Sequence, residues 1–120
     1  MTDEPEKILR AAFPDGIIPH DEGTYSVYIG HIRNRIEYVG ITRRDPDIRF
    51  DEHWNLNTGR ANLTYKVLPS AGTLSNRNAR ISEQILINYY KLQRNGGQLQ
   101  NLINSISPKK LNKYGITLNF

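Results

Sequence analysis

The chain contains no cysteine among its 120 residues. Disulfide bonds and thiolate metal sites are therefore excluded, so any metal ion must be held by oxygen atoms or imidazole nitrogens. The sequence also lacks an apolar run of about 18 residues, the length that a membrane-spanning helix needs. No charged segment followed by an apolar one opens the chain. We therefore expect neither a membrane span nor a signal peptide.

Acidic residues are scarce beyond the N-terminal segment. Residues 1–22 hold six acids against two bases, whereas residues 23–120 hold fourteen bases against six acids. A basic body of this kind is typical of proteins that bind polyanions, although a solvated basic surface would give the same balance. Contact with phosphate is favoured by six arginines that fall close together: Arg33, Arg35, Arg43, Arg44, Arg49 and Arg60.

The length is sufficient for one domain with a modest core. Residues 1–22 are predicted to be an acidic appendage that contains a short helix over 3–13, stopped by Pro14. This segment either shields the basic face or links the domain to a longer chain, and both explanations remain open. The domain itself is expected over residues 23–120.

Two segments rich in tyrosine, valine and isoleucine, 24–32 and 35–42, predict the strands of a β-hairpin. Strand alternation places Tyr28 and Tyr38 on the polar faces of their strands, away from the aliphatic side chains. Both tyrosines share one side of the hairpin only if the loop has an odd number of residues. We therefore expect a three-residue turn that ends at a left-handed Asn34.

A third strand and further helices complete the predicted fold. Asp45 is a helix cap and Pro46 suits the first turn, so a helix should run from there to about Leu56. The other predicted elements are a strand over 62–68, a long helix over 77–94 capped by Ser75 or Asn76, and a short helix near 98–105. The predicted class is α/β, with a small three-stranded antiparallel sheet flanked by helices.

Five polar residues occur at spacings that strands and helices do not require: Tyr28, Tyr38, Arg49, His53 and Glu83. Arg49 and His53 are four apart, so they share one helix face. Glu83 is the only acid after residue 52 and lies in a helix that is apolar around most of its circumference. We expect its carboxylate to be buried and therefore paired with a cation. The five groups suit cleavage of a phosphodiester with one divalent metal.

Each of these residues also has an ordinary structural explanation. Tyrosines are common in strands, and seven occur in this chain. The other structural alternatives are a salt bridge of Glu83 to Arg77 or Arg80, a surface pair of Arg49 with Asp45 or Asp51, and a capping or core role for His53 beside Trp54.

In order and spacing, the five elements resemble the GIY-YIG nuclease family. The matching elements are Val27-Tyr28 for its first motif, Tyr38-Val39-Gly40 for its second, residues 49–53 for its R-x3-H helix and Glu83 for its metal-binding glutamate. The resemblance covers roughly residues 23–105. Ser26 replaces the glycine of the first motif, which is a mild change because a strand interior tolerates serine better than glycine.

The resemblance implies a role for each residue. Tyr28 would orient or deprotonate the attacking water, and Tyr38 would position it or bind phosphate. Arg49 would stabilise the transition state, and His53 would relay the proton from Tyr28. Glu83 would hold a Mg²⁺ or Mn²⁺ ion that neutralises charge on the leaving 3′ oxygen.

Further residues are expected to contact the substrate or to brace the site. Gly40 would let a phosphate approach closely, and Arg43 and Arg44 would bind phosphates. The family also has an asparagine after the glutamate helix that braces the site. Asn101 and Asn104 both fit this position.

We therefore expect a Mg²⁺-dependent endonuclease that acts on DNA in preference to RNA. No helix-turn-helix, zinc finger or repeat is present to recognise base sequence. A bare catalytic module suits a toxin that a larger secreted protein delivers into the cytoplasm of a target cell. The segment 102–110 is similar to the ends of toxin modules from bacterial competition systems, which implies an acidic immunity protein as partner. The alternatives are a metal-independent ribonuclease, acting on tRNA through the 2′-OH, and a non-catalytic nucleic-acid-binding module.

Overall fold

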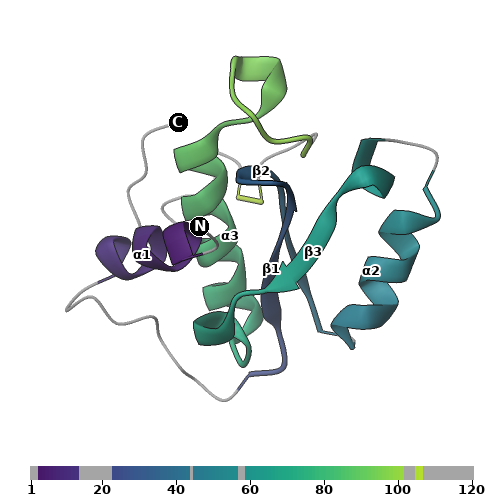
Figure 1. The fold of residues 1–120 in the computed structure, drawn as a ribbon. Helices are drawn as coiled ribbons and strands as arrows, with labels where there is room; N and C mark the ends of the chain where they lie inside the picture. Colours follow the sequence, from purple (N-terminus) through teal and green to yellow (C-terminus); the bar gives the residue numbers. More distant parts are fainter. Residues whose placement is uncertain (1–2, 14–22, 44, 57–58, 102–104, 107–120) are drawn as a thin grey trace.

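Three strands rich in β-branched and aromatic residues form an antiparallel sheet in the order β2-β1-β3 (Figure 1). They are β1 (Ser26–Ile32), β2 (Arg35–Thr42) and β3 (Thr64–Val67). This computed structural model describes residues 3–13, 23–43, 45–56, 59–101 and 105–106. The predicted class, a small α/β fold with a three-stranded antiparallel sheet flanked by helices, is confirmed.

Helices cover both faces of this sheet. They are α1 (Asp3–Ala12), α2 (Pro46–Trp54) and α3 (Asn76–Tyr90). Helices α1 and α3 lie on one side and α2 lies on the other (Figure 1). The caps are as predicted, because the Asp45 side chain accepts a hydrogen bond at the start of α2 and Ser75 does so at the start of α3. Among the described residues, no helix is both long and apolar enough to cross a membrane.

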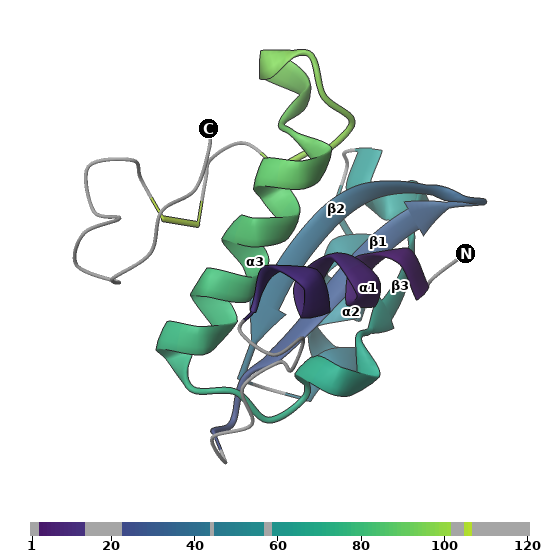
Figure 2. The same cartoon turned by 90° about the vertical axis from the view of Figure 1, so that its left-hand side faces the viewer.

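Helix α1 packs into the main core together with α3. Figure 2 looks onto this side of the molecule and shows α1 and α3 in front of the sheet. Leu9 is fully buried, and the Tyr90 hydroxyl donates a hydrogen bond to the Glu4 carboxylate at 2.6 Å. The acidic N-terminal segment therefore contributes a helix to the same body as the sheet.

The two faces of the sheet bury different kinds of side chain. The face toward α1 and α3 is aliphatic, with buried Val27, Ile29, Ile36 and Val39. The face toward α2 is aromatic, with a second buried cluster made of Tyr28, Tyr38, Phe50, Leu63 and Tyr65. The prediction that both tyrosines lie on a polar face is wrong, because α2 covers that face and both side chains pack in an aromatic cluster.

A β-bulge places the two tyrosines on one side of the sheet. The turn between β1 and β2 has only two residues, and Arg33 rather than Asn34 adopts a positive φ, of 53°. The predicted three-residue turn is therefore wrong. A two-residue turn alone would put Tyr28 and Tyr38 on opposite faces.

The pairing register between the strands restores the predicted arrangement. It shifts between Gly30 and His31, so β2 carries one extra residue there. Beyond the shift, Tyr28 pairs with Gly40 and Gly30 pairs with Tyr38. Each phenol thus lies on the same face as the other, opposite a glycine of the neighbouring strand.

The chain after α3 differs from the prediction. Helix α3 ends at Tyr90 instead of residue 94. Directly after Tyr90, Lys91 adopts a φ of 65° and the Leu92 side chain is buried in the core. Residues 98–101, predicted as the start of a short helix, are extended instead. Leu99 forms a bridge with Leu92, and the Gln100 amide donates to the Glu37 carbonyl at 2.6 Å.

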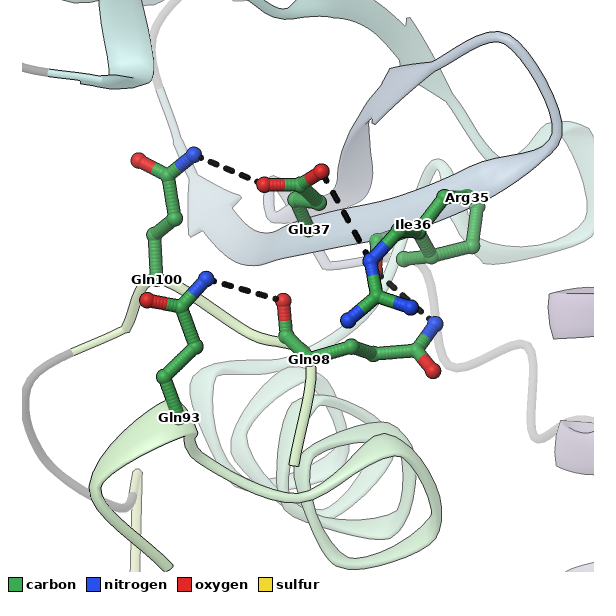
Figure 3. A network of polar contacts seen from close by, with 6 residues as sticks. All are labelled: Arg35, Ile36, Glu37, Gln93, Gln98 and Gln100. Carbon is green, nitrogen blue, oxygen red and sulfur yellow. Dashed lines mark hydrogen bonds and ion pairs between the residues drawn. The ribbon is translucent and has the colours of Figure 1, made fainter. Parts of the chain in front are cut away.

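Glutamine side chains strengthen this contact with the outer edge of β2 (Figure 3). Gln98 donates to the Ile36 carbonyl at 3.0 Å, and Gln100 donates to the Glu37 carboxylate at 3.0 Å. An edge strand presents unpaired backbone groups, which natural folds usually cover. That requirement accounts for the extended conformation here.

Gly40→Ala should destabilise the protein by about 1–3 kcal/mol, the usual effect of overpacking a core. A Cβ atom at this position would lie 2.3 Å from Cζ of Tyr28. Gly72→Ala is the matched control, since its Cβ would meet no atom closer than 3.9 Å. Urea unfolding of both variants measures the difference. Equal midpoints for the two would show that Tyr28 does not pack against Gly40.

Candidate functional site

A buried hydrogen bond between β1 and α2 forms the centre of the candidate site. It joins Oη of Tyr28 to Nε2 of His53 at 2.7 Å, and both side chains are 1% exposed or less. The His53 ring stacks on Tyr65 at a centroid distance of 4.7 Å and meets Tyr38 at 4.9 Å. His53 is therefore a core histidine, as one alternative proposed, and also the partner of Tyr28.

The surroundings keep His53 neutral. Burial lowers the pKa of His53 to about 4, and the nearby cations Arg49 and Arg60 act in the same direction. A neutral imidazole has one nitrogen that donates and one that accepts. Within the described part of the chain Nδ1 has no hydrogen-bond partner. The tautomer with the proton on Nδ1 leaves Nε2 free to accept the phenolic proton of Tyr28.

Tyr28 holds its proton tightly. Burial raises the pKa of Tyr28 above its ordinary value, and Tyr38 adds to this effect, whereas Arg49 opposes it. A free phenolate is consequently disfavoured at neutral pH. Tyr28 can release its proton readily only if another proton arrives at the same oxygen.

Arg49 flanks this phenol from α2. Its carboxylate partner is Glu52, at 3.1 Å, and not Asp45 or Asp51, which the structural alternative named. Partial burial disfavours the guanidinium cation, but Tyr28 and Glu52 outweigh it and raise the pKa of Arg49. Its side chain is 31% exposed, so the cation is fixed beside Tyr28 and still reachable by a ligand.

Glu83 lies on α3, on the opposite side of the sheet from α2 and from the buried aromatic cluster (Figure 1). It is half-buried, and its charge contributes to raising the pKa of Tyr28. Burial raises the pKa of Glu83 itself to about 7, against the opposing influence of the Ser105 hydroxyl and the Arg80 cation. The Arg80 guanidinium donates to the Asn76 side chain and to the Ser105 carbonyl, both at 3.3 Å. These two hydrogen bonds go to groups other than the Glu83 carboxylate.

The position of Arg60 was not apparent from the sequence. Arg60 lies in the short 3-10 helix η2 (Gly59–Asn62), with its guanidinium carbon 4.6 Å from the centroid of the Tyr38 ring. Tyr65 of β3 donates its hydroxyl to the Arg60 carbonyl at 2.7 Å and so holds η2 in place. Strand alternation could have placed Tyr65 on the tyrosine face, but no sequence signal connects Arg60 to Tyr38.

The residues expected to contact substrate have different outcomes. The Tyr28 ring fills the space beside Gly40. The absence of a side chain at Gly40 therefore makes room for Tyr28 and not for the expected phosphate. Both amide atoms of Asn101 bind the backbone of Val39, at 3.1 and 2.7 Å, which braces β2 next to Tyr38. Arg43 is exposed just beyond β2. Arg44 and Asn104 lie outside the described residues.

The structure thus brings Tyr28, Tyr38, Arg49 and His53 into one neighbourhood, from three separate elements of the fold. Glu83 lies on α3, across the sheet (Figure 1), and influences Tyr28 through its charge. No protein-family model matches the chain, and comparisons with curated proteins and with solved structures give no match either. This arrangement of side chains is therefore the basis on which we infer a function.

Glu83 fits a single hard cation better than a multi-ligand metal centre. Among the described residues, no three acidic, histidine or cysteine side chains gather into a group that could hold a metal. A half-buried carboxylate is an oxygen donor that suits Mg²⁺, with water and substrate phosphate as the other ligands. A bound cation would also compensate the charge that burial disfavours.

Glu83→Gln should stabilise the metal-free protein at pH 8 and change little at pH 5. The pKa of Glu83 rises from 4.5 to about 7 on folding. The folded state therefore holds an extra proton between these values, and stability falls as pH rises through the window. The gain at pH 8 should be at most about 3 kcal/mol.

Thermal unfolding in EDTA at both pH values measures this difference. Glu6→Gln is the matched control, because Glu6 is also half-buried but has a cationic partner, Arg10, at 3.2 Å. A Glu83→Gln protein that melts below the parent at pH 8 would contradict the assignment of Glu83 as a carboxylate whose charge the fold disfavours.

Proposed function

We propose that this protein is a metal-dependent nuclease of the GIY-YIG type, which hydrolyses phosphodiester bonds in nucleic acid. The observation that carries the proposal is the buried hydrogen bond of 2.7 Å between Tyr28 and His53, with the Arg49 cation beside Tyr28. Buried titratable groups with displaced pKa values gather most often at functional sites. The basic balance of residues 23–120 supports a polyanionic substrate.

Tyr28 and His53 would activate the attacking water together. As the water oxygen bonds to phosphorus, Tyr28 takes a proton from the water and passes its own proton to Nε2 of His53. This relay avoids a free phenolate, which burial disfavours. Arg49 and Arg60 oppose a charged His53, but the phosphate that binds between them brings negative charge and offsets that effect.

The cations of the site would stabilise the charge that develops on the phosphate. Arg49 can offer two parallel N–H groups to phosphate oxygens. Arg60, held over Tyr38, supplies a second guanidinium. The bond from phosphorus to the 3′ oxygen then breaks, and a divalent cation on Glu83 would neutralise the charge on that oxygen.

DNA as the substrate and a role as an antibacterial toxin are further parts of the proposal. They rest on the sequence resemblance and on the net charge of +4. A toxin of this charge would need an acidic immunity protein that covers the basic face and blocks phosphate entry.

Tyr28→Phe should lower cleavage by about 10²-fold or more, since it removes a group that takes part in proton transfer. Tyr90→Phe is the matched control: it also deletes a hydrogen-bonded hydroxyl, 2.6 Å from Glu4, but on the far side of the sheet. Initial rates on plasmid DNA, single-stranded DNA and total tRNA, with Mg²⁺ and with EDTA, test both variants. Similar rates for the two variants would remove Tyr28 from the mechanism.

The same assay distinguishes the alternative functions. Cleavage of tRNA alone that persists in EDTA would indicate attack by the 2′-OH without metal. Binding of nucleic acid without cleavage of any substrate would indicate a non-catalytic module. Cleavage of plasmid or of single-stranded DNA that EDTA abolishes is the result that the proposal requires.

Arg49→Ala should lower kcat by about 10²-fold, the usual consequence of losing one preorganised contact to the transition state. Arg43→Ala, on the exposed segment beyond β2, should mainly weaken binding and flatten its dependence on salt. Steady-state kinetics over a range of salt concentrations separate the two effects. The opposite pattern would place Arg49 on the docking surface and Arg43 in the site.

A further inference from the structure

Trp54 presents a fixed aromatic surface at the end of α2. It is the only tryptophan of the chain and is 46% exposed. Its Nε1–H donates to the Leu63 carbonyl at 2.9 Å, and its ring meets Phe50 and Tyr65 at centroid distances of 6.2 and 6.0 Å. Because these contacts hold the indole in place, a flat ligand could stack on it at little cost in side-chain entropy.

Tyr65 connects this indole to the proposed cleavage centre. The Tyr65 ring is 6.0 Å from Trp54 and also 6.0 Å from Tyr28, measured between centroids. Its hydroxyl holds the carbonyl of Arg60, whose guanidinium lies over Tyr38. Tyr65 thus contacts the exposed indole of Trp54 and holds the backbone of Arg60, and its own ring packs against Tyr28.

The charges around Trp54 indicate how a nucleic-acid strand would lie. Asp47 and Asp51 are exposed and share a flank of α2 with Trp54 by helical spacing. Carboxylates repel phosphate, so the sugar-phosphate backbone would avoid this flank and follow the side of Arg60. A base that projects from the backbone can then reach the neutral face of the indole.

We propose that Trp54 and Arg60 form a nucleotide subsite, in which an unpaired base stacks on the indole and the adjoining phosphate contacts the guanidinium. The inference rests on the proposed nuclease function and narrows its substrate class. A base within a duplex is stacked on both faces and must be unpaired before it can reach Trp54. The preferred substrate is therefore single-stranded nucleic acid or an unpaired segment.

Tryptophan fluorescence tests this directly, because Trp54 is the only emitter of its kind. A titration in EDTA, where cleavage is not required, compares a short oligodeoxythymidine with a duplex of equal length. We expect the single strand to quench the emission and the duplex to leave it nearly unchanged. Quenching that is equal for both forms would overturn the proposed preference for unpaired bases.

Variants separate stacking from a merely structural role. Trp54→Ala should weaken single-strand binding about 5- to 150-fold, the range of one base–aromatic stack, as measured by anisotropy of a labelled strand. Trp54→Phe loses the same hydrogen bond to Leu63 but keeps a stackable ring, so it should recover most of the affinity. Tyr89→Ala, which removes a 58% exposed aromatic from α3, should have no effect. Equal loss in the Phe and Ala variants would overturn the subsite.

Failure of this inference differs from failure of the proposed function. If plasmid cleavage depends on Tyr28 but no strand quenches Trp54, the nuclease proposal stands and the subsite falls. If emission responds to protein concentration and to no nucleic acid, Trp54 lies in an interface between copies, and the subsite also falls. Absence of both cleavage and binding would overturn the two proposals together.

Discussion

Tyr28 and His53 meet inside an aromatic cluster where each would be left with an unsatisfied polar atom without the other. Their hydrogen bond of 2.7 Å is buried. A buried donor or acceptor that lacks a hydrogen-bond partner costs about 1–3 kcal/mol of stability. The bond fixes α2 against β1 and thereby sets where Arg49 lies. The position of the site and the packing of this face of the sheet depend on the same contact.

Burial then determines the charge state of the site. It holds His53 neutral down to about pH 4 and holds Glu83 partly protonated near pH 7. The His53 contribution to stability is lost as pH falls from 6.5 through 4, whereas the Glu83 carboxylate costs stability as pH rises from 4.5 through 7. The two groups therefore act in opposite directions. A bound cation would offset the cost of the Glu83 charge, and a bound phosphate would offset the cost of charging His53.

Gln100 and Asn101 link the β2 edge of the sheet to η2, the short helix that carries Arg60. Asn101 binds the backbone of Val39, and Gln100 binds Glu37 at the irregular part of β2. The Gln100 amide also lies against Gly59, where an added Cβ would be 2.7 Å from its oxygen. The bulge that aligns the two tyrosines and the helix that places a cation over Tyr38 are thus held by one segment.

The sequence by itself determined the elements that depend on neighbours along the chain. These are the caps at Asp45 and Ser75, the strands, and the shared helix face of Arg49 and His53, because caps, alternation and helical spacing act over a few residues. Tertiary structure decided the bulge in β2, the burial of the tyrosine face under α2, the extended path of residues 98–101 and the position of Arg60. These features depend on how segments meet in the folded chain, as Asn101 meets Val39 across 62 positions of sequence, and no local pattern encodes them.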